Sequence, residues 1–429
     1  MKLKLHWRIL IALVLGLGAG WWAGEDGAVL GLRFYAVFDF VGTLFINALK
    51  MIIVPLIMSS IIVGIAGIGS SGNLGRLGGK TLLFYAVTTT LAILVGLVMV
   101  NLLKPGIVDG APAGDLLALT AGAEDVAARV GDRGASDIVE IFLRMVPPNI
   151  VQAAADGQML GIIFFSLLFG FFMTKVTSEL AETMFRFWQG VFQVMMLITE
   201  WVMAFAPIGV FALVARVVAT TGFQAAGPLL VFAGTVLLAL TIHTAITLPA
   251  LLALVGRMNP WPMFQAMAPA MMTAFSTASS SATLPITMDC VERRAGVSNR
   301  TSSFVLPLGA TGNMDGTALY ECVAAIFIAQ AYGLELTFAT QFVIVVTALV
   351  TSIGVAGIPS ASLVAIAIIL KAVGLPMEAI GVLLVFDRVL DMVRTTVNVF
   401  GDSCCAVLVA RLEGEEVLNV GSAEAEGAR

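Results

Sequence analysis

The chain has 429 residues, of which 59% are hydrophobic and only 12% are charged. Soluble globular domains carry about 25% charged residues, so most of this protein's surface must face lipid rather than water. The formal net charge is −5, and no basic cluster of the kind that binds nucleic acid is present. The composition therefore predicts a polytopic membrane protein and argues against a nucleic-acid partner.

Apolar segments long enough to cross a bilayer follow one another along the first 256 residues. The first one comes after MKLKLHWR and lacks a clear cleavage site, so we expect a retained helix rather than a signal peptide. The predicted helices span residues 8–30, 36–68, 80–104, 138–174, 184–218 and 225–256.

The loops differ in charge, and this difference predicts an orientation. Lys and Arg gather at the N-terminus and in the loops after the second and fourth spans, which places these regions in the cytoplasm. Residues 106–137 are acidic and rich in Gly and Ala, so we expect an extracellular loop. Residues 412–429 are polar, and we expect a disordered cytoplasmic tail.

From about residue 262 to residue 411, Ser, Gly, Pro, Asn and Asp interrupt the apolar segments at membrane depth. Such breaks are tolerated only inside protein or beside a water-filled cavity. One break is STASSSATLP (276–285), followed by a helix broken at NMDGT (313–317). The second is TSIGVAGIPSASL (351–363), followed by a helix that carries DMVRTTVN (391–398). Corresponding breaks predict two re-entrant hairpins in inverted repeats around a binding site, with ordinary turns as the alternative.

The last apolar segment carries charges whose spacing places them on one face of an α-helix. The face consists of Asp387, Asp391, Arg394, Asn398 and Asp402. Each charge at the bilayer centre costs about 2.5–3.5 kcal/mol, so such residues mark a functional site. The Arg394 guanidinium suits a carboxylate, and Asp391, one turn away, can receive an ammonium group. The pair predicts a ligand that has both groups; the alternative is a structural Asp391–Arg394 salt bridge.

Arg388 lies one residue off this face. We favour a partner role for Arg388 with Asp387, or a side chain that extends to the membrane surface.

The helix before the second break carries oxygen ligands beside two glycines. Gly312 and Gly316 flank Asn313 and Asp315, which favours a locally unwound helix whose carbonyl groups point at a cation. Sodium is a hard cation and takes oxygen ligands. Glu321 lies one turn after Thr317, and a carboxyl inside an apolar span is a candidate proton carrier; a hydrogen-bonded structural acid is the alternative.

At these residues the chain resembles the glutamate transporter family, the dicarboxylate/amino acid:cation symporters. The resemblance rests on four motifs in order: SSSATLP (279–285), LPLGATGNMDGTALYE (306–321), SIGVAGIPSAS (352–362) and DMVRTTVNVFGD (391–402). It implies eight transmembrane helices and two hairpins in a homotrimer that works by an elevator mechanism. A scaffold would comprise residues 1–75 and 138–220, and a moving transport domain residues 76–105 and 221–411.

The resemblance also implies roles for single residues. Arg394 would hold the side-chain carboxylate, Asp391 the amino group, and Asn398 with the Ser280 amide the α-carboxylate. Ser279, Thr317, Thr395, Ile358 and Ser362 would complete the pocket. One sodium site would comprise Gly309, Asn313, Asn398 and Asp402. A second would comprise backbone groups of Thr311, Ser352, Ile353 and Val355. A third would comprise Tyr85, Thr88, Thr89, Asn313 and Asp315, where plain helix packing is the alternative.

Three departures from the family pattern bear on mechanism. Ala278 stands where archaeal members carry an arginine, and Met392 stands where animal acidic members carry a second one; Arg388, one turn earlier, could supply that charge. Glu321 matches the proton-carrying acid of animal members. These residues imply sodium coupling and leave proton co-transport and potassium counter-transport open.

The residues Arg394 and Asp391 together favour glutamate or aspartate as the substrate. C4-dicarboxylates or neutral amino acids are the alternatives within the family, and an ion channel is the alternative outside it. An enzyme is not expected, because His6 and His243 are the only histidines and no metal or nucleophile motif is present; we interpret His243 as a packed or hydrogen-bonded helix residue. The expected location is the inner cell membrane, with both termini in the cytoplasm.

Overall fold

The computed structural model describes residues 5–24, 27–29, 32–69, 74–117, 119, 143, 146–155, 159–221, 226–334, 336–354 and 362–418. Helices dominate the described residues, which confirms the all-helical class. Two short antiparallel ladders accompany them. Strand β1 (Ala28–Val29) pairs with β2 (Leu32–Arg33), and β3 (Ile107–Val108) pairs with β4 (Ala111–Pro112). The second ladder and the short 3-10 helix η1 (Asp115–Leu117) occupy the start of the expected extracellular loop, whose residues 120–137 lie outside the described part.

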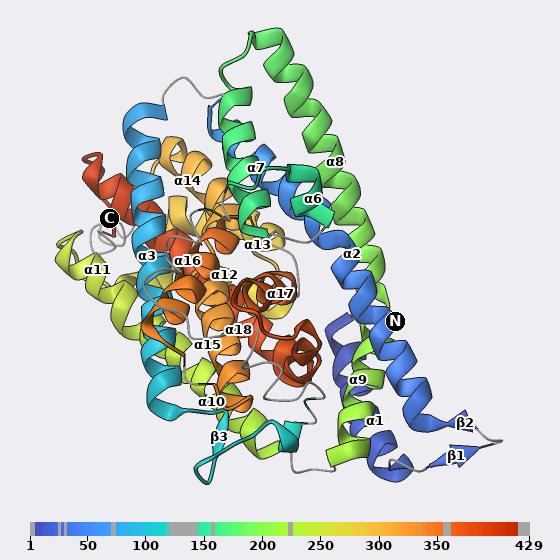
Figure 1. Ribbon diagram of the computed structural model, residues 1–429. Coiled ribbons are helices and arrows are strands. Elements are labelled where there is room, and N and C mark those ends of the chain that lie inside the picture. Colours follow the sequence, from blue (N-terminus) through green and yellow to red (C-terminus); the bar gives the residue numbers. More distant parts are fainter. Residues whose placement is uncertain are drawn as a thin grey trace.

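One group of helices comes from the first half of the chain and occupies one side of the molecule (Figure 1). The group comprises α1 (Leu5–Ala23), α2 (Phe34–Gly69), α6 (Ile150–Ala155), α7 (Met159–Met173), α8 (Ser178–Ala204) and α9 (Ala206–Thr221). Helix α1 packs along α9, and α2 contacts α7, α8 and α9. The crossing of α1 and α9 is close, since a Cβ at Gly20 would lie 2.5 Å from the Ala215 carbonyl oxygen.

A second group packs around α15 (Asp315–Ala331), in which every residue except Gln330 is buried. Its N-terminal members are α3 (Leu74–Leu103), α10 (Ala226–Ile242), the π-helical turn η2 (His243–Thr247) and α11 (Leu248–Leu254). The others are α12 (Trp261–Thr277), α13 (Ser280–Arg293), α14 (Asn299–Gly312), α16 (Phe338–Gly354), α17 (Ser362–Val373), η3 (Met377–Ala379) and α18 (Ile380–Leu412). Helix α18 has 33 residues and is therefore about 50 Å long.

Breaks between helices occur where the sequence predicts them. Helix α12 ends at Ala278, which has a left-handed φ of 50°, and the Ser279 side chain then caps α13 by accepting from the Ala282 N–H. Asn313 and Met314 separate α14 from α15 in non-helical conformations. Helices α16 and α17 flank the other predicted break, whose residues 355–361 lie outside the described part.

Large apolar side chains cover the outside of the helices. Two helical stretches among the described residues, Leu77–Leu103 and Ala226–Leu254, are long and apolar enough to cross a membrane. Trp21 and Trp22 of α1 are 68% and 72% exposed, and Leu254 is 78% exposed. An apolar surface of this extent is favourable in contact with lipid tails and unfavourable in contact with water.

The sequence predicts a disordered tail directly after α18, but the first residues after this helix contact other parts of the chain. The Lys80 ammonium donates to the Leu412 carbonyl at 2.8 Å and pairs with Glu413 at 2.6 Å. The Glu415 carboxylate accepts from the Ser298 N–H and hydroxyl and from the Thr301 hydroxyl, at 2.6 to 2.8 Å. These contacts hold Leu412, Glu413 and Glu415 against Lys80 and the start of α14, and residues 419–429 of the predicted disordered tail lie outside the described part.

Candidate functional site

Arg394 is the centre of a buried charge cluster on α18. Its Nη2 donates to Asp387 Oδ1 at 3.0 Å and to Asp391 Oδ1 at 3.1 Å, because residues 387, 391 and 394 share one helix face. Its Cζ lies 3.8 Å from the centroid of the Tyr320 ring, a cation–π contact. Nε and Nη1 have no hydrogen-bond partner among the described residues. The guanidinium is thus held at one nitrogen and keeps the donors that a ligand carboxylate would need.

Arg388 belongs to the same cluster, and its partner differs from the predicted one. The Arg388 Nη1 lies 3.5 Å from Asp391 Oδ2, and no ion pair with Asp387 forms among the described residues. Its side chain is only 6% exposed, so it does not extend to a surface either. Asp391 therefore meets a guanidinium at each of its two oxygens.

Asn398 joins α18 to the start of α15. Its Oδ1 accepts from the Gly316 N–H at 2.8 Å and the Thr317 N–H at 3.3 Å, and its Nδ2 donates to the Thr317 hydroxyl at 3.0 Å. A Cβ at Gly316 would lie 2.7 Å from the Arg394 carbonyl oxygen, so only glycine lets the two helices approach this closely. The predicted substrate residues Asn398 and Thr317 thus meet next to Arg394.

Three further predicted pocket residues are buried. Ser280, Thr395 and Ser362 are 3% to 5% exposed, and Ser280 and Ser362 begin the helices α13 and α17 at the two predicted breaks. Ser279 serves as the N-cap of α13. Ile358 lies outside the described residues.

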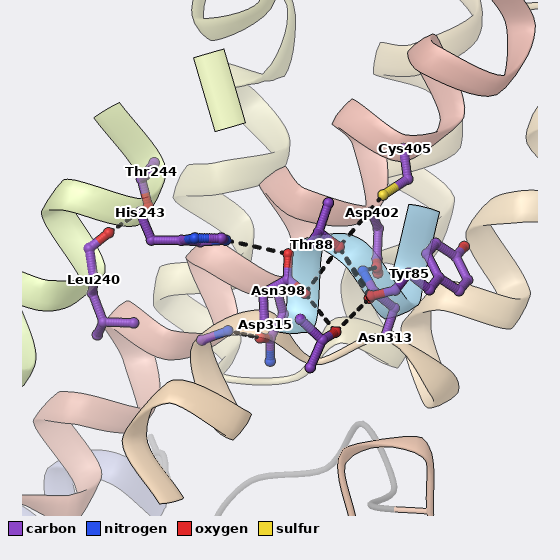
Figure 2. A network of polar contacts seen from close by, with 12 residues as sticks. Tyr85, Thr88, Leu240, His243, Thr244, Asn313, Asp315, Asn398, Asp402 and Cys405 are labelled. Atoms are coloured by element: carbon purple, nitrogen blue, oxygen red, sulfur yellow. Dashed lines mark hydrogen bonds and ion pairs between the residues drawn. The ribbon is translucent and has the colours of Figure 1, made fainter. Parts of the chain in front are cut away.

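Oxygen atoms from three helices gather in a second cluster (Figure 2). The Thr89 hydroxyl donates to Asp315 Oδ1 at 2.8 Å and Asn313 Oδ1 at 3.0 Å, and Thr88 donates to the same atoms at 3.2 and 3.5 Å. The Asn313 amide donates to Asp402 Oδ1 at 2.8 Å. All five side chains are at most 3% exposed. The two carboxylates form no ion pair with a lysine or an arginine in the described part of the chain.

Two glycines bring the backbone up to these carboxylates. A Cβ at Gly309 would lie 2.6 Å from Asp402 Cγ and 2.7 Å from Tyr85 Oη, and a Cβ at Gly401 would lie 2.6 Å from Asp315 Oδ2. The Tyr85 hydroxyl donates to the Val305 carbonyl at 2.6 Å. Any side chain at these two glycines would displace the carboxylates, so the cluster depends on them.

The donors of this cluster are carboxylate, amide and hydroxyl groups. No group of three or more His, Cys, Asp or Glu side chains is placed to hold a metal ion within the described ranges. The four cysteines are buried and form no disulfide. Hard, neutral oxygens with a few carboxylates suit an alkali cation better than a transition metal.

Comparison with known proteins identifies the family. The Sodium:dicarboxylate symporter family matches residues 5–412. The chain belongs to this family. It is 36% identical over 423 residues to the proton/glutamate-aspartate symporter of Escherichia coli strain K12, which covers 96% of this chain and 94% of that protein. It is 34% identical over 423 residues to the proton/sodium-glutamate symport protein of Bacillus caldotenax, at 96% of both chains. It is also 36% identical over 436 residues to the neutral amino acid transporter B(0) of Bos taurus, at 94% of this chain and 78% of that protein.

Membership in this family confirms the resemblance drawn from the four motifs and identifies a membrane transporter. The first and third predicted sodium sets share Asn313. Its side chain donates to Asp402 of the first set and accepts from Thr89 of the third set. Two side chains of these sets are not joined in this way: Asn398 contacts α15 rather than Asp402, and the Tyr85 hydroxyl donates to the Val305 carbonyl.

The second predicted sodium set lies where α14 and α16 end. These helices contact each other, and Thr311 and Ile353 are in their last turns. The Ser352 hydroxyl donates to the Leu349 carbonyl of its own helix at 2.8 Å. Val355 lies outside the described residues, so this set stays a prediction.

Glu321 is fully buried on α15 and reaches a neighbouring helix. The Thr351 hydroxyl of α16 donates to Glu321 Oε2 at 3.0 Å, while Oε1 has no partner among the described residues. The candidate proton carrier is thus bonded to the helix that leads into the second predicted hairpin.

His243 is a neighbour of the second cluster, and the sequence alone does not predict which residue it contacts. Its Nε2 lies 3.4 Å from Asp315 Oδ2, and both side chains are completely buried. The π-helical turn His243–Thr247 begins at this residue. A lone histidine in an otherwise apolar span is the signal that could have drawn attention to it.

Proposed function

We propose that this chain is a secondary active symporter that couples the uptake of an acidic amino acid, glutamate or aspartate, to sodium. One observation carries the proposal. A single face of α18 presents a guanidinium with open donors beside two carboxylates and, two turns later, a carboxylate that faces only amide and hydroxyl groups. The names of the E. coli and B. caldotenax relatives point to the same substrate class.

The substrate would bind at the first of these clusters. The side-chain carboxylate would bind to the open Arg394 donors, and its ammonium group would bind to Asp391, one turn away. Ser279, Ser280, Thr317, Thr395, Asn398, Ile358 and Ser362 would line the rest of the pocket. A ligand without the carboxylate would leave the buried Arg394 donors unpaired, and this is the basis of selectivity.

Sodium ions would bind at the second cluster, between Asp315, Asp402, Asn313 and the two threonines. Neither buried carboxylate pairs with a lysine or an arginine in the described part, and the His243 ring lies 3.4 Å from Asp315 Oδ2, so a cation would balance charge that the protein leaves open. Asn398 and Asn313 lie on segments shared by both clusters, so ordering one cluster by a ligand would favour the other. Such coupling is reciprocal: sodium would raise substrate affinity and substrate would raise sodium affinity.

A proton would be a further coupled ion, carried by Glu321. Through the hydrogen bond from Thr351, protonation of the Glu321 carboxyl would affect α16, the helix that leads into the second predicted hairpin. The variant Glu321→Gln keeps a hydrogen-bond acceptor but cannot exchange a proton. It should transport with a rate that no longer depends on pH between 6 and 8; unchanged pH dependence would rule out this role.

Alternating access would occur by an elevator movement within a homotrimer. The scaffold would comprise residues 1–75 and 138–220, and the transport domain residues 76–105 and 221–411. In support, α1, α2, α7, α8 and α9 contact one another, whereas both charge clusters lie on helices of the second group. We propose eight transmembrane helices and two hairpins in the inner membrane, with both termini in the cytoplasm. The chain would be a transporter and not an enzyme.

Uptake of radiolabelled aspartate and glutamate into proteoliposomes tests the proposal, with sodium, pH and potassium varied independently on each side. We expect accumulation above the external concentration only with an inward sodium gradient. Equal accumulation without sodium would overturn the sodium coupling. Uptake of alanine or serine in preference to aspartate would favour the alternative that the name of the bovine relative suggests.

A further inference from the structure

Thr347 of α16 has a buried hydroxyl that the proposed function does not use. Its side chain is 1% exposed, and its Oγ1 has no hydrogen-bond partner among the described residues. Other buried threonines in the helices donate to the backbone carbonyl four residues earlier: Thr235 donates to Val231 at 2.8 Å, and Thr81 donates to Leu77 at 2.9 Å. Most buried polar atoms in native proteins pair with a protein group or an ordered water. Thr347 therefore indicates a further polar partner at this point of α16.

Glu321 of α15 has a second atom of this kind. Its Oε1 has no partner among the described residues, whereas its Oε2 accepts from the Thr351 hydroxyl at 3.0 Å. The same Thr351 hydroxyl lies 2.8 Å from the Thr347 carbonyl. Thr347 and Thr351 are four residues apart, so their side chains share one face of α16. Glu321 Oε1 and Thr347 Oγ1 therefore lie at the same contact between α15 and α16.

A water molecule suits these two atoms. Water can donate to a carboxylate and accept from a hydroxyl at the same time, and buried waters typically make about three hydrogen bonds. A metal cation would need more oxygen ligands than one carboxylate and one hydroxyl supply. The chemistry of the two atoms therefore favours the exchange of a proton over the binding of an ion.

The charges around Glu321 favour the α16 side for this exchange. The helices α3, α10, α16, α17 and α18 pack against α15. Helices α10 and α16 carry no charged residue, and the lysines and arginines of α3 and α17 lie in the first two turns or the last turn of their helix, at Arg76, Lys80 and Lys371. In the described part of the chain, Glu321 interacts with the charge of Arg394 from α18 and with its neighbour, the Cys322 thiol. The positive charge of Arg394 opposes a proton on its side, whereas α16 presents neutral hydroxyls.

We propose that a water bound between Glu321 Oε1 and Thr347 Oγ1 is the point at which the transported proton enters and leaves the protein's carrier, and that Thr347 relays it. The inference deepens the proposed function and rests on it, because it assumes that Glu321 carries the proton. On release, Oε1 gives its proton to the bound water, which passes one of its own to the Thr347 oxygen. The Thr347 hydroxyl gives its original proton to solvent water. One proton leaves, the water and the hydroxyl end as they began, and Glu321 becomes a carboxylate.

Sodium-driven uptake of labelled aspartate into proteoliposomes, in H2O and in D2O, tests the relay. Thr347→Val keeps the shape of the side chain and removes the hydroxyl. Its uptake rate should fall by at least about tenfold, and its solvent isotope effect should exceed that of the parent, because proton transfer becomes rate-limiting. Equilibrium binding of aspartate and sodium should not change. Thr347→Ser keeps the hydroxyl and should stay within about threefold of the parent rate. Thr235→Val, which removes a buried hydroxyl of α10, is the matched control and should leave the isotope effect unchanged.

A double variant separates a relay from a structural role. Glu321→Gln has no proton to exchange, so Glu321→Gln/Thr347→Val should transport at the rate of Glu321→Gln. A further loss in the double variant, or a Thr347→Val that matches the parent in rate and isotope effect, would overturn the inference. If Glu321→Gln keeps the pH dependence of the parent, the proposed proton carrier fails first, and that result is distinct from either outcome at Thr347.

Infrared difference spectra of the purified parent protein keep the inference testable if Thr347→Val folds poorly. Spectra taken between low and high pH should contain an O–H band of bound water that shifts in water labelled with oxygen-18. This band should disappear in Glu321→Gln. A parent spectrum without such a band would overturn the inference.

Discussion

The two charge clusters both include residues of α18 and are both buried, yet they balance charge differently. Around Asp387 and Asp391 the protein supplies two arginines, and the ion pairs are 3.0 to 3.5 Å long. Around Asp315 and Asp402 it supplies hydroxyls, an amide and the His243 ring, and no lysine or arginine within the described part. The first cluster is formally neutral, whereas the second has negative charge that no lysine or arginine of the described part balances.

This difference separates what each cluster can bind. A neutral cluster with open guanidinium donors recognises a ligand by the geometry of its carboxylate and ammonium groups. A cluster of oxygens with excess negative charge binds a cation and gains little from a neutral ligand. Because the clusters share α18 and α15, cation binding and substrate binding would favour each other.

The largest effect is expected from Arg394→Cys, which removes the fixed cation of the first cluster. Affinity for aspartate should fall by at least about 100-fold, because the substrate carboxylate loses its buried partner. Affinity for neutral amino acids should rise in relative terms. Competition against labelled aspartate and serine in proteoliposomes measures both, with Arg411→Cys as the control. Retained glutamate uptake in Arg394→Cys would refute the assigned role.

The second cluster should respond in the opposite way. In Asp402→Asn and in Asp315→Asn, the sodium concentration for half-maximal uptake should rise by about tenfold or more at saturating aspartate, because each change removes a negative charge from the cation site. Asp289→Asn is the control, since Asp289 pairs with Arg293 in an exposed position on α13. A larger effect on aspartate affinity than on sodium affinity would contradict the assignment of sodium to the second cluster and of substrate to the first.

Removal of one hydroxyl should have a smaller effect. Thr89→Val keeps the shape of the side chain but removes the hydroxyl that lies 2.8 Å from Asp315 Oδ1 and 3.0 Å from Asn313 Oδ1. The half-maximal sodium concentration should rise by about three- to tenfold. Thr89→Ser keeps the hydroxyl and should lie close to the parent. If the valine and serine variants behave alike, the hydroxyl has no part in sodium binding.

The smallest effect is expected at Glu415, an acid outside the membrane-spanning segments whose carboxylate accepts hydrogen bonds from Ser298 and Thr301. Partial burial raises the pKa of Glu415, but hydrogen bonds from Thr301 and Ser298 outweigh it and hold the pKa below its ordinary value of 4.5. A lowered pKa in the folded state gives stability that is fully present above the ordinary pKa and lost as pH falls through the folded one.

Glu415→Gln should therefore destabilise the protein by about 1 kcal/mol at pH 7 and by less as pH falls below about 4.5. Thermal unfolding in detergent at pH 7 and pH 4 measures this, with its exposed neighbour Glu416→Gln as the control. A destabilisation equal at both pH values would contradict the assigned hydrogen bonds. Sodium should not change the Glu415 effect, whereas it should change that of Asp315→Asn.

The sequence could predict the shared face of α18, because helical periodicity alone places residues 387, 391, 394, 398 and 402 together. It could also predict the breaks near Ser279 and Asn313, because runs of small and polar residues cannot form an ordinary lipid-facing span. The family motifs pointed to the oxygens around Asp315. These features depend on local pattern, which a single sequence contains.

Other features depend on tertiary contacts and could not be predicted in that way. Arg388 can reach Asp387 or Asp391 from its place on the helix, and only the packed structure selects Asp391. Lys80 and Glu413 are separated by more than 300 residues, so no local sequence pattern predicts their ion pair. The same holds for His243 and Asp315, which come together only when α10 packs against α15.

Titration of purified protein with aspartate at a series of sodium concentrations is the most direct test of the coupling between the two clusters. We expect the apparent Kd of aspartate to fall steeply as the sodium concentration rises, and Asp402→Asn to shift this dependence to higher sodium concentrations. An aspartate affinity that is independent of sodium in the parent protein would contradict it.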